Sequence, residues 1–361
     1  MSEKSAVPQG YREAVERAAL VDRNDRGRLL LHGRAPAQML AGIVTNRLPD
    51  APEPEDEGSR VRGRARYAAI LTPKGKMVTE LRLIRLEGEV EAFLLDLPAA
   101  GLEGTMAYFG KYLPPRFATV DDLAGETGML TVVGPAAAET LVGEGLASDS
   151  ATLEQMEEDA FVAYPDRDRP HTDSIRVLRA WAGAVPAFDV LGRRSAIVEL
   201  RGRLEGAGLP VLGEEVERVL RIESGRPVFG EELDESTIPL EAGLEERAID
   251  HGKGCYTGQE VIIRIRDRGK VNRHLRGLLL GDVAPPEPGT ELYIDGRSRG
   301  AGEVRSAVRS PRFGQTVGLG YVRRELEIPG RARLGFPDGP EVDVREVTDG
   351  GWVLAEGDPG A

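Results

Sequence analysis

The chain has 361 residues, of which 40% are hydrophobic and 30% charged, and its formal net charge at pH 7 is −13. The length predicts two or three domains, the apolar content excludes a disordered chain, and the acidic balance argues against non-specific nucleic-acid binding. No window approaches the roughly 20 apolar residues that a bilayer span needs, and the segment from Met1 to Leu20 carries charges throughout. One cysteine fits a reducing compartment. We therefore expect a cytoplasmic protein without a membrane contact.

The first part of the chain alternates between helix and strand patterns. Apolar residues at helical spacing predict helices at 11–23, 35–48, 102–112 and from 136 to 141. Apolar and β-branched runs bounded by turn residues predict strands at 28–33, 66–71, 77–86, 90–95, 116–120 and 129–133. Paired strands alternating with single helices are typical of an α+β sandwich.

An acidic segment interrupts this pattern near residues 49–60. Within it, positions 49 to 58 hold three prolines and five acidic residues. Such a composition cannot bury a core, so we expect a disordered insertion on the surface.

The pattern of strands and helices recurs and then changes in the last quarter of the chain. Strands at 174–181 and 185–190 precede a helix at 195–207, which predicts a second domain of the same class. Short strands at 274–280, 290–294, 301–308 and 316–321 are separated by Gly- and Pro-rich turns. We therefore expect two mainly antiparallel α+β sandwich domains within 1–270 and an all-β barrel at 271–361.

The segment from His251 to Glu260 contains the single cysteine, Cys255, two positions after Lys253. Thr257 is placed to cap a following helix, and Glu260 stands where a capping box requires an acid. A helix N-terminus and a nearby ammonium group both favour a thiolate, the form of cysteine that attacks or binds metal. The alternatives are that Cys255 is a small buried hydrophobe and that the other two residues only cap the helix.

The segment Lys253-Gly-Cys-Tyr-Thr-Gly-Gln-Glu260 resembles the K-G-C-[FY]-x-G-Q-E signature of the YgfZ-type proteins. These are the folate-binding, iron–sulfur-assembly branch of the superfamily that includes the aminomethyltransferase (T-protein) of the glycine cleavage system. The resemblance extends to the segments 45–48, 67–81, 221–225, 239–243, 304–311 and 318–322. It implies a ring of three domains with tetrahydrofolate in a central channel.

The chain departs from the aminomethyltransferase pattern at two acidic positions. The transferase has an acidic pair where this chain has Thr79-Glu80, and Asp189 is the only acid left where its G-Y-T-G-E loop would lie. Either carboxylate suits the N–H donors of a pterin, and the alternative for each is an exposed or strand-edge acid. The resemblance implies a catalytic Cys255 assisted by Lys253. It also implies folate-site roles for Glu80, Asp189, Tyr67, Arg221, Glu223, Tyr256, Gln259 and Arg264.

Residues 251–280 include seven basic and two acidic side chains, a local net charge of +5. This segment is either a solvated helix face or a site for an anion such as the folate glutamate tail or a partner's cluster or persulfide. Only Tyr256 is aromatic there, which argues against base stacking on nucleic acid. We expect no metal site, because the histidines lack zinc-site spacing and one cysteine cannot supply four thiolates.

The sequence favours a tetrahydrofolate-binding accessory protein for iron–sulfur cluster assembly or repair, acting through Cys255, over an enzyme with fast turnover. Its partners would be iron–sulfur assembly factors or client proteins, and nothing requires more than a monomer. The alternative is a folate-dependent aminomethyltransferase or demethylase that transfers a one-carbon unit to tetrahydrofolate. A third reading, a folate-independent RNA-binding module, rests on the basic segment alone.

Overall fold

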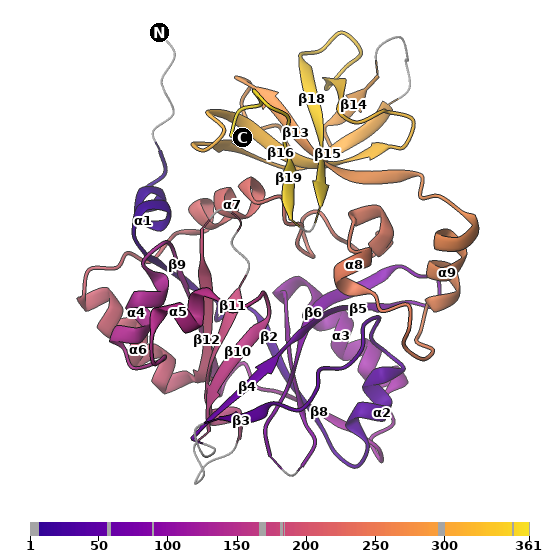
Figure 1. Cartoon of the computed structure of the whole chain (residues 1–361). Helices are drawn as coiled ribbons and strands as arrows, with labels where there is room; N and C mark the ends of the chain where they lie inside the picture. Colours follow the sequence, from indigo (N-terminus) through magenta and orange to yellow (C-terminus); the bar gives the residue numbers. More distant parts are fainter. Residues whose placement is uncertain are drawn as a thin grey trace.

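The computed structural model describes residues 7–55, 59–88, 90–165, 171–180, 183, 185–294, 300–348 and 350–360. Its strands form three sheets in which neighbouring strands run antiparallel. Helices cover two of the sheets, and the third lies apart at the C-terminal end (Figure 1). The α+β class with antiparallel sheets and an all-β C-terminal domain is thereby confirmed.

The first sheet has the strand order β1-β9-β12-β11-β10-β4-β3. Its strands are β1 Ala19–Asp22, β3 Glu53–Glu55, β4 Arg60–Arg64, β9 Thr127–Val133, β10 Ala160–Tyr164, β11 Ile175–Ala180 and β12 Ala187–Arg193. Helices α4 Ala137–Gly143, α5 Ser150–Glu154 and α6 Arg194–Gly206 lie on one face, where α6 packs on β9 and β12. A buried apolar cluster that includes Leu130, Phe188 and Ile197 joins these helices to the sheet.

The second sheet has the order β5-β6-β7-β2-β8. Its elements are β2 Gly27–His32, β5 Arg66–Leu71, β6 Met77–Arg85, β7 Phe93–Leu97 and β8 Thr119–Asp122, with helices α2 Pro36–Ala41 and α3 Ala99–Tyr112. Ile84 and Leu94 of this sheet pack with Met129, Phe161 and Leu178 of the first sheet in one buried cluster. The two sheets therefore share a core, and polar residues at its edge are held between them.

The third sheet closes into a barrel. Its strands are β13 Arg273–Gly281, β14 Glu291–Tyr293, β15 Gly300–Ser310, β16 Gln315–Arg323, β17 Gly330–Leu334, β18 Glu341–Thr348 and β19 Gly351–Val353. The order is β13-β16-β15-β14-β17-β18-β19, and β13 also pairs with β18, which closes the sheet. Full closure removes exposed strand edges, and the interior is filled by residues such as Leu278, Val304 and Val344.

The remaining helical elements are short. They are α1 Tyr11–Glu16, α7 Glu214–Glu223, α8 Glu245–Ala248 and α9 Gln259–Arg268, with 3-10 turns η2 His171–Asp173 and η3 Pro239–Ala242. Helix α7 contacts β15 and β16 and lies between the barrel and the first sheet (Figure 1). Val216, Val219 and Ile222 on its apolar face are buried in the resulting cluster.

Three sequence predictions differ from these elements. The predicted helix 11–23 ends at Glu16, because residues Ala19–Asp22 form β1 at the edge of the first sheet, where they pair with β9. The predicted helix 35–48 is only the short α2, which ends before Gly42. In the acidic segment predicted to be disordered, residues Glu53–Glu55 form β3 on the edge of the first sheet, where Arg60 and Arg62 pair with Glu55; residues 56–58 lie outside the described residues.

Candidate functional site

Two cavities adjoin where the first and second sheets meet. The inner cavity, of about 520 Å³, is lined by side chains from β6, β9, β12 and α7 and by the segment 226–231. The outer cavity, of about 550 Å³, is lined mainly by residues 46–47, 64–67, 246–247 and 249–251. Five residues line both cavities: Tyr67, Glu158, Asp159, Arg226 and Arg247. Both volumes lie in the range of small-molecule sites, roughly 300–1,000 Å³.

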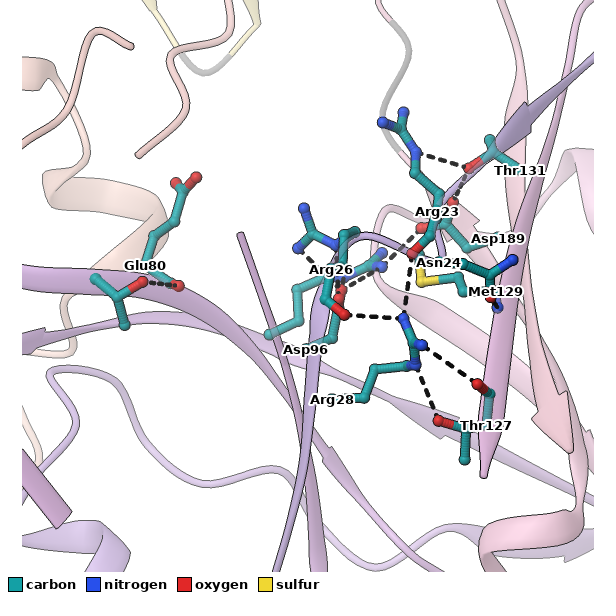
Figure 2. A network of polar contacts seen from close by, with 12 residues as sticks. Arg23, Asn24, Arg26, Arg28, Glu80, Asp96, Thr127, Met129, Thr131 and Asp189 are labelled. Carbon is teal, nitrogen blue, oxygen red and sulfur yellow. Dashed lines mark hydrogen bonds and ion pairs between the residues drawn. The ribbon is translucent and has the colours of Figure 1, made fainter. Parts of the chain in front are cut away.

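Arg82 of β6 forms the centre of a buried charge network on the wall of the inner cavity. Its guanidinium donates to Asp96 on β7 and lies 2.7 Å from Oδ2 of Asp189 on β12. Arg26 binds the other side of Asp96 at 2.6 Å (Figure 2). Burial acts to raise the pKa of Asp96, but Arg26 and Arg82 outweigh it and hold that pKa well below the usual range.

Arg28, whose side chain is fully buried, hydrogen-bonds to the loop between β1 and β2. Its guanidinium donates to the backbone oxygens of Arg23 and Arg26 and to the side chain of Thr127 (Figure 2). A buried guanidinium is tolerated when its donors are satisfied, and here they fix the loop that presents Arg26. Sequence analysis did not single out Arg26, Arg28, Arg82 or Asp96.

Asp189 and Glu80 are both buried on interior strands, so the alternative of an exposed or strand-edge acid is wrong for both. Both oxygens of Asp189 are engaged: Oδ1 accepts a 2.6 Å hydrogen bond from Thr131, and Oδ2 pairs with Arg82. Glu80 lies apart from that network in Figure 2. Its Oε1 accepts from the backbone N–H of Phe229 at 3.1 Å, and its Oε2 accepts from the hydroxyl of Tyr67.

Tyr67 and Arg221 also line the inner cavity, as their assigned roles require. Burial, with the charge of Glu80 second, raises the pKa of Tyr67 well above its usual value, and the Arg247 guanidinium stacks 3.8 Å from its ring centre. Arg221 is held by Glu231 at 2.7 Å and Glu232 at 2.8 Å.

Glu223 does not line the inner cavity. It accepts hydrogen bonds from Tyr11 at 2.8 Å and Ser310 at 2.5 Å and lines a separate cavity of about 450 Å³ beside the barrel. Burial raises its pKa, against the lowering effect of these hydrogen bonds. The structure therefore separates Glu223 from Arg221, although the two are only two residues apart in the sequence.

The cysteine segment differs from the predicted capping arrangement. Helix α9 begins at Gln259, and its N-cap is Gly258, not Thr257; Gly258 makes no side-chain cap. Its φ of 85° is in the left-handed region, and a Cβ there would lie 2.7 Å from the Thr72 backbone oxygen. The turn at Thr72–Gly75 thus packs against the start of α9 and requires glycine at this position.

Cys255 is exposed, so the alternative of a small buried hydrophobe is wrong, and it lines none of the three cavities described above. The Lys253 ammonium donates to the backbone oxygens of Ala41, at 2.9 Å, and Val44. Burial lowers the pKa of Lys253 to about 8. Lys253 therefore binds the end of α2.

The other predicted residues of this segment also lie away from the cavities described. Tyr256 is buried in the apolar cluster beneath β5, and burial raises its pKa to about 12. Gln259 begins α9, and Arg264 is exposed on that helix. Part of the local basic charge is paired, with Arg266 bound to Asp267 and Arg273 to Glu241.

Asp159, which sequence analysis did not identify, lines both cavities and is 8% exposed. Burial raises its pKa, against the lowering effect of Arg247 and Arg82. Its position in the run Glu157-Glu158-Asp159 is typical of a solvated charge cluster. The only local signal is the apolar strand that begins directly after it.

Within the described part of the chain, no group of three His, Cys, Asp or Glu side chains is arranged to hold a metal ion. Over the same residues, none of the helices is both long enough and apolar enough to cross a membrane.

Comparisons with known proteins find similarity to aminomethyltransferases over most of the chain. The family model of the glycine cleavage T-protein C-terminal barrel domain matches residues 273–346. The aminomethyltransferase of Thermosynechococcus vestitus is 28% identical over 337 residues, covering 91% of this chain and 82% of that protein. The aminomethyltransferase of Rubrobacter xylanophilus is 29% identical over 318 residues, covering 87% of this chain and 79% of that protein.

A solved structure shares the fold. The crystal structure of the glycine cleavage system aminomethyltransferase T from Bartonella henselae superimposes with a TM-score of 0.76 at 19% identity. The match covers 93% of this chain and 86% of that protein.

Proposed function

From the similarity of this chain to aminomethyltransferases, we propose that it binds tetrahydrofolate in the inner cavity and transfers to it the carbon of an aminomethyl group, with release of the amine. The observation that carries this proposal is the inner cavity at the junction of the two sandwich sheets, which adjoins a second cavity that opens beside Asp250 and His251. Relatives named aminomethyltransferase, matched over 82% and 79% of their length, favour one-carbon transfer over an accessory role.

The residues lining the cavities fit the chemical groups of tetrahydrofolate. Apolar side chains such as Val21, Met129 and Phe229 suit the faces of a pterin ring, and buried carboxyl groups suit its N–H donors. The outer cavity includes two arginines, Arg66 and Arg247, whose Nε atoms are buried without a hydrogen-bond acceptor. Unused guanidinium donors suit the carboxylates of the glutamate tail.

Bound tetrahydrofolate would supply the nucleophilic ring nitrogen that takes up the one-carbon unit. The chain's own contribution is to position the ring and to exclude water. Buried groups such as Tyr67 and Glu80 are already fixed by mutual hydrogen bonds, so the wall they form is preorganised.

Calorimetric titration of the reduced protein with tetrahydrofolate under anaerobic conditions tests the binding. We expect saturable one-to-one binding. Cys255→Ser should bind equally well, because Cys255 lines none of the described cavities. No binding up to about millimolar ligand, an affinity weaker than roughly −4 kcal/mol, would overturn the proposal. Formation of methylenetetrahydrofolate from an aminomethyl donor, whose carbon is already at the oxidation level of formaldehyde, with release of ammonia then tests the transfer step.

A second function is favoured by one observation, the exposure of Cys255 outside the cavities. A thiol on the surface is placed for a macromolecular partner, which suits an accessory role in iron–sulfur cluster assembly or repair, as in YgfZ-type proteins. In a deletion strain, Cys255→Ser should then fail to support the activity of cluster enzymes while still binding tetrahydrofolate. Full rescue by Cys255→Ser would contradict this role and leave one-carbon transfer.

A further inference from the structure

Asp159 is held by its backbone at the point where the chain crosses between the two sandwich sheets. Its N–H donates to the Arg179 oxygen at 3.0 Å, and its own oxygen accepts from the N–H of Ala65 at 2.8 Å. Ala65 separates β4 of the first sheet from β5 of the second. With φ at 66°, Asp159 is the one non-glycine residue of positive φ in the described chain. A conformation of this kind is uncommon outside glycine and is a feature of functional sites.

Among the described residues no hydrogen bond or ion pair holds the carboxyl group of Asp159, although the charges of Arg82, Arg226 and Arg247 act on it. Arg82 is bound to Asp96 and Asp189, as described above. Arg226 and Arg247 each bind one oxygen of Glu158, at 2.8 and 2.7 Å. Each of these arginines thus binds another acid, and both carboxyl oxygens of Asp159 can accept hydrogen bonds from a ligand.

The other two acids on the inner cavity assigned to folate differ from Asp159 in this respect. Both oxygens of Glu80 accept hydrogen bonds from within the protein, and so do both oxygens of Asp189. A ligand that bound either of them would have to displace Tyr67, Thr131 or an arginine. A ligand that bound Asp159 from either cavity would displace no protein group from its carboxyl oxygens.

We propose that Asp159, and not Glu80 or Asp189, is the carboxyl group that accepts the two parallel N–H donors on the pyrimidinone edge of tetrahydrofolate, the 2-amino group and the ring N3–H. This assignment rests on the proposed function. A carboxylate accepts such a donor pair with its two oxygens, which fixes both the position and the orientation of the ring. Asp159 lines both cavities, so a ring anchored there extends into one and its substituent into the other.

The test compares two ligands and two matched variants. The ligands are tetrahydrofolate and an analogue in which a methyl group replaces the 2-amino group, and their dissociation constants are measured by anaerobic calorimetry. Asp159→Asn keeps the shape of the side chain, and asparagine tolerates positive φ. Asp189→Asn is the matched control at the other acid. Asp159→Gly, which also permits positive φ, repeats the test if the asparagine variant does not fold.

The wild-type protein should bind tetrahydrofolate about 10- to 100-fold more tightly than the methyl analogue. This ratio is the value of one or two hydrogen bonds to a charged acceptor. Asp159→Asn should reduce this preference to less than about threefold, and Asp189→Asn should retain it. Retention of the full preference by Asp159→Asn, or its loss only in Asp189→Asn, overturns the assignment while the proposed function stands. Failure of the wild-type protein to bind tetrahydrofolate overturns both.

Discussion

Arg82 and Asp189 lie on central strands of two different sheets, and their side chains meet at 2.7 Å. Each belongs to a directly opposed cross-strand pair, Arg82 with Asp96 and Asp189 with Thr131. The contact therefore connects two hydrogen-bonded pairs and joins the sheets at the wall of the inner cavity. We expect this contact to help hold the two sheets in register where they line the proposed site.

Replacing Arg82 with methionine should destabilise the protein strongly. The substitution leaves the carboxylates of Asp96 and Asp189 buried without this cation, and breaking a buried pair in this way costs about 3–5 kcal/mol. Urea unfolding at pH 7 measures the loss. The matched control is Arg331→Met, because Arg331 is 68% exposed and its pair with Glu341 is worth about 0–1 kcal/mol. Equal losses in the two variants would contradict the proposed importance of the Arg82 network.

The same network predicts an acid-labile protein. The folded-state pKa of Asp96 is depressed, so the unfolded chain binds more protons than the native one between that value and about 4. The stability from Asp96 is present above about pH 4 and is lost as the pH falls further. The wild type should lose roughly 2–3 kcal/mol from this group at low pH. Between pH 5 and pH 2.5 the urea midpoint of Asp96→Asn should fall less than that of the wild type. Parallel falls in the two proteins would exclude Asp96 as a source of the acid lability.

The sequence predicted the strands well where periodicity alone decides them. The strand at 66–71 was predicted with its observed bounds, and 77–86 is within one residue of β6. The helix at 11–23 was overestimated because tertiary pairing decides Ala19–Asp22: the strand buries Leu20 between neighbours that lie more than a hundred residues away in sequence. Local pattern does not report such distant partners.

The site was predicted only in part for the same reason. Of the folate-site residues that the resemblance implied, Tyr67, Glu80, Asp189 and Arg221 line the inner cavity, whereas Glu223 binds Tyr11 and Ser310. Which side chains of the two sheets come into contact decides that Asp189 pairs with an arginine and that Asp159 has no ion-pair partner. That information is carried by the tertiary structure and not by the spacing of residues along the chain.

Lys253 should contribute to stability and not to thiol reactivity. Its ammonium is bound to the backbone oxygens of Ala41 and Val44 at the end of α2. Lys253→Ala should therefore cost about 1–2 kcal/mol in urea unfolding. The rate at which Cys255 reacts with an aromatic disulfide reagent should stay within about threefold of wild type. A tenfold slower reaction in a folded Lys253→Ala variant would restore the predicted assisting role of the lysine.

Arg66 should select for the glutamate tail of the folate. Its Nε is buried without an acceptor on the wall of the outer cavity. Arg66→Gln should weaken tetrahydrofolate binding about 3- to 10-fold, the value of one charge-assisted hydrogen bond that is partly screened. Binding of a tetrahydropterin without the glutamate should not change. Calorimetry with both ligands makes the comparison, and an equal loss for both would place Arg66 against the ring instead.

Asp159 should reduce the stability of the free protein at neutral pH. Its folded-state pKa is raised, so the native state binds more protons than the unfolded chain between about pH 4 and that value, and stability falls as the pH rises through this window. Asp159→Asn should therefore raise the free energy of unfolding by about 1–3 kcal/mol at pH 7 and change it little at pH 3. Urea unfolding at the two pH values measures the difference. If Asp159→Asn were less stable than wild type at pH 7 and unchanged at pH 3, the ionised carboxylate would be held by Arg82 and Arg247. It would then be a structural group, with no unused acceptors for a ligand.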